Sequence, residues 1–474
     1  MKHIVVIGGG IAGLAAAHRV IELSQEKSLA VKATLLEASP RLGGSIATER
    51  VGDFLLEAGP DSFITEKPWA LKLCDRIGLI PRLISTQSAY QKIYVVHDGK
   101  LVELPEGFFL LAPTRLWPFI QTPLFSWPGK LRMAGELLLP RGHLNGDESL
   151  GAFVRRRFGA EALERVAQPL VGGIYASDPD MLSLGATMPR FKEMERSSRS
   201  VIYAMWSTQR RRAKRAETGS GARWSLFVTL AGGMQELVDN LAQRLPEGTT
   251  RLSSPATELK RNSDDTWNIG LGNTETIKGD AVIVATPAFR TGALLGQIDG
   301  NAADELTAIP YASTATVSAA FRREDFAHAP NSFGFVVPAI EKRKIMACTF
   351  SSLKYPGRAP QDKILLRAFV GGSLQPGLFE ASDSEMEGSV RGELRSLLGV
   401  TAAPLFTRIW RHPKSMPQYH VGHDARVSRI ETALQKFPTL ALAGSAYHGV
   451  GISDCVRTGE EAAEKVFARV HSIS

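Results

Sequence analysis

Apolar residues first gather in a short run over residues 4–7, which predicts a buried strand. Over 11–23 the pattern changes to an Ala-rich helical periodicity, and a second apolar run follows over 33–36. Glycines occupy the turn between the first strand and the helix. This order of strand, glycine turn, helix and strand predicts an α/β fold that opens with a Rossmann-type unit.

The rest of the chain carries further strand and helix patterns. Strand patterns lie at 51–60, 92–96, 101–104, 252–260, 266–271, 278–287, 311–321, 333–338, 345–350, 363–370 and 407–413. Helical patterns lie at 68–77, 148–165, 183–208 and 235–245, and residues 440–466 follow the order strand, glycine loop, helix. The strands after residue 310 predict a second, largely antiparallel sheet.

The segment 106–130 departs from these patterns. It is rich in Phe, Trp and Leu, but Pro113, Pro118, Pro123 and Pro128 interrupt it every five residues. Proline inside a helix removes a hydrogen bond and clashes with the preceding turn, so no long helix is expected. Two interpretations stay open: an irregular segment that lines an apolar pocket or packs in the core, and a surface that dips into a bilayer without crossing it.

Composition narrows the class of protein. The 474 residues are enough for two or three packed units, and the net charge of +8 suits anionic partners. The basic run at 210–215 stands in no DNA- or RNA-binding module, so no nucleic-acid partner is expected. The three cysteines form no C-x-x-C pair, and we expect no metal site, signal peptide or spanning helix. These features predict a cytoplasmic protein, with peripheral attachment to the cytoplasmic membrane left open.

The first glycine turn carries the clearest candidate chemistry. Gly8, Gly10 and Gly13 have G-x-G-x-x-G spacing, which allows a tight turn, a close approach of a pyrophosphate and close packing of the helix. The helix N-terminus offers N–H groups and the positive end of its dipole to phosphates. Glu37 ends the second strand, where a carboxylate accepts hydrogen bonds from ribose hydroxyls. Together they predict a dinucleotide-binding site.

A second glycine pair indicates which dinucleotide binds. The sequence RLGG at 41–44 closely follows Glu37 and resembles the extended signature of FAD-dependent flavoproteins of the amine-oxidase type. Its backbone offers a further approach to the FAD pyrophosphate, and Arg41 adds positive charge. Many members carry Arg or Lys after the pair; Ser45 stands there in this chain, which removes one phosphate contact.

Further blocks extend this resemblance over nearly the whole chain. They are VIVATP at 282–287, AGSAYHGVGISDCVRTGEEAA at 443–463, LEAGPDSF at 56–63, FVGG at 369–372 and SMPQYHVGH at 415–423. With the N-terminal motifs, they resemble FAD-dependent porphyrinogen oxidases of the oxygen-dependent type. The resemblance implies a Rossmann-type FAD-binding domain, a mixed-sheet substrate domain and an inserted helical domain. The implied limits are 1–90, 222–300 and 431–474 for the FAD-binding parts, 91–107 and 301–430 for the substrate domain, and 108–221 for the helical domain, the candidate for membrane contact.

The resemblance also implies which residues bind FAD. They are Gly8, Gly9, Gly10, Ile11, Ala12 and Gly13 at the pyrophosphate; Glu37 and Ala38 at the adenosine; Arg41, Gly44 and Ser45 near the phosphates and the flavin side; Gly59, Pro60, Asp61 and Ser62 along the isoalloxazine; Ala256 at the adenine; Ser445, Val450, Gly451 and Ile452 at the flavin ring and phosphates; and Trp410 as a further candidate.

For the substrate, the resemblance implies an apolar clamp and charged anchors. Phe369 and Val336 would clamp the tetrapyrrole, and the carbonyl of Gly173 would face its pyrrole N–H groups. Lys92 would anchor a propionate where relatives often carry Arg, with Lys67 as a second cation nearby. A point charge there makes the anchoring less directional than a guanidinium fork would. Ordinary strand core explains Phe369 and Val336 equally well, and a solvated lysine is the alternative for Lys92.

The implied activity is oxidation of protoporphyrinogen IX or coproporphyrinogen III to the porphyrin, in heme biosynthesis. FAD would take a hydride from a bridge carbon and a pyrrole N–H would lose a proton, with oxygen as acceptor and six electrons removed in three rounds. No triad or acid–base pair is apparent, so no catalytic residue is assigned. A flavin amine oxidase, a carotenoid-type desaturase and a non-catalytic FAD-binding scaffold are the alternatives. A homodimer is left open.

Overall fold

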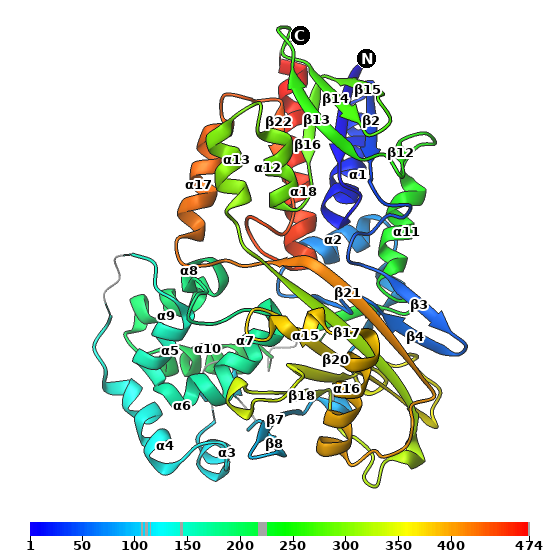
Figure 1. Ribbon diagram of the computed structural model, residues 1–474. Helices are drawn as coiled ribbons and strands as arrows, with labels where there is room; N and C mark the ends of the chain where they lie inside the picture. Colours follow the sequence, from blue (N-terminus) through cyan, green and yellow to red (C-terminus); the bar gives the residue numbers. More distant parts are fainter. Residues whose placement is uncertain (106–107, 110–111, 114, 143–145, 217–224, 473–474) are drawn as a thin grey trace.

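The structure, a computed structural model, describes residues 1–105, 108–109, 112–113, 115–142, 146–216 and 225–472. Two large sheets and a group of helices are the main parts of this structure (Figure 1). The side chains of the basic run at 210–215 lie outside the described part.

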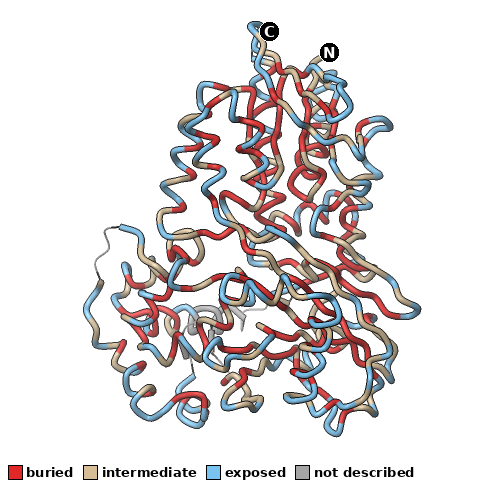
Figure 2. Tube along the Cα trace, in the orientation of Figure 1, coloured by how far each residue is buried: buried red, intermediate tan, exposed pale blue. Residues whose placement is uncertain are grey.

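A five-stranded parallel sheet has the strand order β12-β2-β1-β16-β22. Its strands are β1 (Lys2–Ile7), β2 (Val31–Leu36), β12 (Thr250–Arg251), β16 (Ala281–Val284) and β22 (Leu440–Leu442). Because helices cover both faces of such a sheet, its central strands are apolar without alternation. Figure 2 shows this region as mostly buried.

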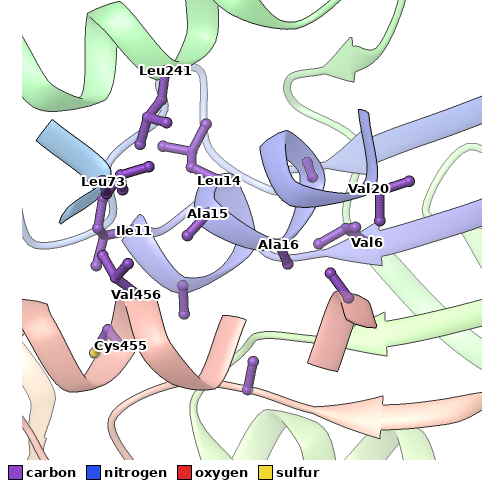
Figure 3. Packing of buried hydrophobic residues seen from close by; sticks show 14 of the residues in the cluster. Val6, Ile11, Leu14, Ala15, Ala16, Val20, Leu73, Leu241, Cys455 and Val456 are labelled. Carbon is purple, nitrogen blue, oxygen red and sulfur yellow. The ribbon is translucent and has the colours of Figure 1, made fainter. Parts of the chain in front are cut away.

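Helices pack on both faces of the parallel sheet. One face carries α1 (Ile11–Glu26), α2 (Trp69–Arg76), α11 (Gln235–Arg244) and α18 (Ile452–Ser472). Figure 3 shows their core, where Ile11 and Leu14 of α1 lie near Leu73, Leu241 and Val456 of the other three helices. The other face carries α12 (Ala288–Leu295), α13 (Gly300–Thr307) and α17 (His423–Leu434).

The second large sheet has seven strands in the order β21-β17-β20-β19-β18-β7-β8. They are β7 (Ile93–His97), β8 (Lys100–Glu103), β17 (Tyr311–Arg322), β18 (Gly334–Val336), β19 (Ala347–Phe350), β20 (Lys363–Gly371) and β21 (Phe406–Pro417). Only the β18–β7 pair is parallel, so the predicted, largely antiparallel second sheet is confirmed. Helix α16 (Asp383–Leu398) covers one face, and the hairpin of β3 (Thr48–Val51) and β4 (Phe54–Glu57) packs on the other.

Helices α3 to α10 form a third group, at the lower left of Figure 1. Their bounds are α3 (Leu116–Gln121), α4 (Trp127–Ala134), α5 (Leu150–Phe158), α6 (Ala160–Ala162), α7 (Gln168–Tyr175), α8 (Leu184–Thr187), α9 (Pro189–Ser198) and α10 (Val201–Ala216). Their apolar core also holds a fully buried ion pair between Arg157 and Glu136. Glu136 accepts the Val201 N–H at 2.8 Å, so this carboxylate fixes the start of α10.

Smaller sheets and helices complete the described part. The strands are β5 (Phe63–Ile64), β6 (Leu83–Ser85) and β11 (Phe227–Leu230); β13 (Ala256–Arg261), β14 (Trp267–Leu271) and β15 (Thr276–Gly279); and β9 (Phe108–Phe109) with β10 (Ala112–Pro113). The helices are α14 (Ser351–Lys354) and α15 (Pro376–Glu380). The division of the chain into three domains stays a prediction.

Several predicted elements differ from the structure in their limits, and two of them show the physical reason. The helix predicted over 148–165 stops at Phe158, because Gly159 adopts a φ of +95° that ends it. The strand predicted over 252–260 begins only at Ala256. The N–H groups of Ser253 and Ser254 bond to the carbonyls of Ser39 and Glu37 instead of a sheet neighbour. In 106–130, the described residues form the two-residue strands β9 and β10, the short helix α3 and the start of α4, and no long helix, as the proline spacing predicts.

Candidate active site

Of Gly8, Gly10 and Gly13 in the first glycine turn, only Gly10 has open space where a side chain would lie. A Cβ on Gly8 would lie 2.6 Å from the Ala285 carbonyl oxygen, and a Cβ on Gly13 would lie 1.8 Å from the Gly8 carbonyl oxygen. A Cβ on Gly10 would meet no atom within 4 Å. Gly8 and Gly13 are therefore required by packing, whereas the space beside Gly10 fits a pyrophosphate at the N-terminus of α1.

Glu37 lies at the end of β2 and is fixed by backbone N–H groups. One carboxylate oxygen accepts the Gly9 N–H at 2.7 Å, and the other accepts the Ser39 N–H at 2.8 Å. Each oxygen keeps a lone pair that can accept a ribose hydroxyl. The Ser254 N–H donates to the Glu37 carbonyl at 2.8 Å, which brings the start of β13, with Ala256, to the same edge.

The second glycine pair closes on the first turn. The Gly43 N–H donates to the Gly9 carbonyl at 2.9 Å, and a Cβ on Gly44 would lie 3.4 Å from the Gly10 Cα. The guanidinium of Arg41 donates to the carbonyls of Leu42, Gly44 and Ile46. Arg41 thus holds the shape of this loop, and a direct contact with a phosphate stays a prediction.

The strand register places the candidate substrate residues in one row across the second sheet. Val336 pairs with Ala347, Ala347 with Phe369, Phe369 with Thr316, and Thr316 with Trp410. Directly paired residues of neighbouring strands point to the same face. Val336, Phe369 and Trp410 therefore share one face of this sheet, although they come from three distant segments.

The segment 57–62, from the LEAGPDSF block, lies against that face. Two side chains donate hydrogen bonds to the Ala58 carbonyl: the Thr316 hydroxyl at 2.8 Å and the His412 Nε2–H at 2.9 Å. The guanidinium of Arg367 donates to the Gly59 carbonyl. A Cβ on Gly59 would lie 1.8 Å from the Ser45 carbonyl oxygen. This segment is thus fixed between the second sheet and the second glycine loop, which suits a strip that lies along a flavin.

Asp61 forms the centre of a partly buried charge cluster. Its oxygens lie 2.9 and 3.1 Å from the Lys354 Nζ and 4.0 Å from the Arg367 guanidinium, and the Ser62 hydroxyl donates to it at 2.7 Å. Burial favours the protonated carboxyl, but the charges of Lys354 and Arg367 outweigh it and hold the pKa of Asp61 well below its usual range. Asp61 is therefore ionised at neutral pH and neutralises part of this positive cluster.

A third part of the site is the loop before α18. Ile452 begins this helix and is buried against α1. Val450 and Val336 both pack against the apolar core of the third helical group, so a predicted flavin residue and a predicted substrate residue adjoin one apolar cluster. Lys67 donates to Asp454 in the first turn of α18 at 2.6 Å. To anchor a substrate carboxylate as well, the Lys67 ammonium must therefore bind that carboxylate and Asp454 at the same time.

The remaining candidates lie at the rim of this arrangement. Gly173 is an exposed residue of α7, a helix in contact with β18, and a Cβ there would meet no atom within 4 Å. Lys92 immediately precedes β7 and forms an ion pair with Glu103 at 2.8 Å, with both side chains well exposed. The lysine is thus at the surface, and its role as an anchor stays a prediction.

Sequence reasoning missed the polar side chains that hold the site together. Arg367, Lys354, Thr316 and His412 contact the 57–62 segment from three strands and α14. Arg367 offered a usable signal: it is the single charge within the apolar run ILLRAFV, and a buried charge requires a partner. Thr316 and His412 gave no such signal, because their partners are backbone carbonyls far away in sequence.

The glycine turns, Glu37 and the open space at Gly10 together form a dinucleotide-binding site of the Rossmann type. A family profile for flavin containing amine oxidoreductases matches residues 11–467. The chain belongs to this family, its cofactor is FAD, and it is an oxidase.

Named relatives are similar over nearly the full length. The coproporphyrinogen III oxidase of Bacillus subtilis (strain 168) is 36% identical, with 97% of both chains covered. Protoporphyrinogen oxidase 2 of Arabidopsis thaliana is 27% identical over 100% of this chain and 95% of its own. The crystal structure of an Exiguobacterium sp. 255-15 protein assigned as a protoporphyrinogen oxidase superposes with a TM-score of 0.86 at 32% identity, with 99% of both chains covered.

Proposed function

We propose that this protein oxidises coproporphyrinogen III to the porphyrin in heme biosynthesis, with oxygen as electron acceptor and six electrons removed in three rounds. The observation that carries the choice of substrate is the higher identity to the Bacillus coproporphyrinogen III oxidase, 36% against 27% for the Arabidopsis protoporphyrinogen oxidase. Bound FAD supplies hydride acceptance from a bridge carbon of the substrate.

The chain's own residues supply binding and orientation. Val336, Ala347 and Phe369 offer an apolar strip for the tetrapyrrole, and Gly173 leaves space where a pyrrole can approach the backbone. Lys67 and Lys92 offer positive charge for propionates. The Gly10 turn, Glu37 and the 57–62 segment would hold the cofactor.

A paired measurement tests this function against its alternatives. Under nitrogen, coproporphyrinogen III should bleach the flavin absorbance, and protoporphyrinogen IX should do so more slowly. Porphyrin fluorescence should appear once oxygen is admitted, because reoxidation of the flavin allows the second and third rounds. Reduction by a polyamine, with no reaction of either porphyrinogen, would favour a flavin amine oxidase. A flavin that no candidate substrate reduces would favour a non-catalytic scaffold. Light scattering of the purified protein tests the homodimer.

We also propose that the surface of α3, α4 and the following turn binds an anionic membrane. Phe119, Phe125 and Met133 are buried, as the packed-core interpretation requires. A second set points outward and is 40–81% exposed: Leu116, Trp117, Ile120, Trp127, Leu131 and Leu138. Apolar side chains beside cations favour the interface of a bilayer with anionic headgroups.

The charge of this surface supports that partner. Arg115, Arg132 and Arg141 are exposed on this segment, whereas Lys130 is buried and donates to the Ile120 carbonyl. The single acid of residues 115–142, Glu136, is buried against Arg157. No helix among the described residues is long and apolar enough to cross a membrane, so contact would be peripheral.

Co-sedimentation with vesicles tests this surface. The protein should bind phosphatidylglycerol vesicles and bind phosphatidylcholine vesicles weakly. Trp117→Ser combined with Leu131→Ser should abolish binding, whereas the control Ile340→Ser, at an exposed apolar residue elsewhere, should not. Equal binding by the double variant, or no binding by the wild type, would contradict the proposal.

A further inference from the structure

The SMPQYHVGH block contains a buried tyrosine that no step above uses. Tyr419 is 1% exposed, and its ring stacks on the imidazole of His423 with centroids 4.0 Å apart. Its hydroxyl donates to the Ser445 carbonyl at 2.6 Å and accepts the Gly449 N–H at 2.8 Å. One hydroxyl therefore joins the two ends of the loop 445–449.

This loop leads directly into the residues proposed to contact FAD. Val450 and Gly451 follow it, and α18 begins at Ile452. Gly449 has a φ of +124°, and the Asp454 carboxylate lies where its Cβ would be, so the backbone has little freedom at this point. A bond that fixes the Gly449 N–H thus also fixes the direction in which the chain enters α18.

The backbone around Tyr419 is held by the third helical group. The Ser183 N–H donates to the Tyr419 carbonyl at 2.8 Å, and the Gln418 Nε2 donates to the Tyr175 carbonyl at 3.0 Å. Asp147 accepts the Ser183 hydroxyl and the Gly422 N–H, each at 2.8 Å. Tyr419 therefore lies between the helices near the predicted substrate residues and the loop near the flavin.

We propose that Tyr419 is a positioning residue for FAD, and that its hydroxyl sets the conformation of the 445–449 loop and so the fit of the flavin. This inference rests on FAD as the cofactor and on the placement of that loop beside it, and is independent of which porphyrinogen reacts. The ring of Tyr419 packs on His423, and its hydroxyl constrains the 445–449 loop through the two hydrogen bonds.

A pair of tyrosine-to-phenylalanine variants separates these two contributions. Tyr419→Phe keeps the ring and its stacking but leaves the Ser445 carbonyl and the Gly449 N–H without this partner. Tyr447→Phe is the matched control, because Tyr447 lies in the same loop and is also buried, but its hydroxyl faces Thr291 of α12 and bonds to neither Ser445 nor Gly449. Both holoproteins are diluted, and the rate of FAD release is followed by the rise in flavin fluorescence.

Tyr419→Phe should release FAD about tenfold to a hundredfold faster than the wild type, since an unmatched buried polar group weakens a complex on that scale. It should also shift the midpoint potential of the bound flavin and lower kcat while leaving KM nearly unchanged. Tyr447→Phe should match the wild type in all three. Wild-type release rate and potential in Tyr419→Phe, or equal effects of both variants, would overturn the proposal. Because FAD release needs no substrate, the inference can be tested even if the proposed substrate is wrong.

Discussion

Replacing Asp61 by asparagine removes the one carboxylate that lies between Lys354 and Arg367. Asn keeps nearly the same volume and can still accept from Ser62, so the change isolates the charge. The two cations have side chains only 17% and 5% exposed, and Asp61 is 19% exposed. Removing one partner of a buried ion pair typically costs about 3–5 kcal/mol, because the remaining charge stays desolvated and unpaired.

This energy predicts a measurable change in thermal stability. The unfolding entropy of globular proteins, about 2 cal/mol/K per residue, gives about 1 kcal/mol/K for a chain of this size, so Asp61→Asn should lower the unfolding midpoint by about 3–5 °C. Differential scanning calorimetry of both proteins in excess FAD gives this difference. Asp264→Asn removes a carboxylate from an exposed pair with Lys278 and should leave the midpoint unchanged.

The pH dependence adds a second test of the same reasoning. The pKa of Asp61 is lower in the folded protein than in the unfolded chain, so its stabilisation is complete above the unfolded value, about 4, and is lost as the pH falls further towards the folded value. The difference between wild type and Asp61→Asn should be constant from pH 5 to 8 and narrow below pH 4. An unchanged midpoint at pH 7, or a difference that widens in acid, would refute the buried-charge account.

Three further predictions concern the cofactor, the substrate and a histidine. Gly10→Val should fold yet purify without flavin absorbance, because its side chain enters the pyrophosphate space, whereas Gly13→Val should fail to fold; a yellow Gly10→Val protein would contradict this. Lys92→Met should raise KM for coproporphyrinogen III by about tenfold to a hundredfold, and Lys92→Arg should not; unchanged steady-state kinetics would leave the Glu103 ion pair as the role of Lys92. Burial lowers the pKa of His423 to about 4, so its neutral form stabilises the fold fully above the unfolded value of about 6.5 and less as the pH falls towards 4. The thermal midpoint of the wild type should therefore fall relative to that of His423→Phe between pH 7 and 4, and a constant difference would be inconsistent with a buried neutral imidazole.

Local rules made the first glycine turn predictable from sequence. Gly8, Gly10, Gly13 and Glu37 act within one strand–helix–strand unit, and their roles depend on backbone geometry that spacing alone specifies. The structure agrees with this distinction among the glycines: packing requires Gly8 and Gly13, and the space beside Gly10 is open.

The second half of the site could not be derived locally. Val336 and Phe369 share a face only because β19 lies between their strands, and that pairing depends on long-range contacts. Ordinary strand patterns explain both residues equally well, so the resemblance singled them out, not their periodicity. Asp61 and its ion-pair partner Lys354 are 293 positions apart in the sequence, so no local pattern connects them.

If this protein oxidises coproporphyrinogen III, its bound FAD must accept electrons from that substrate. Anaerobic stopped-flow mixing of the holoprotein with coproporphyrinogen III and, separately, with protoporphyrinogen IX tests it most directly. We expect rapid bleaching of the flavin absorbance with coproporphyrinogen III, slower bleaching with protoporphyrinogen IX, and peroxide when oxygen is admitted. A flavin that stays oxidised with both porphyrinogens would contradict the claim.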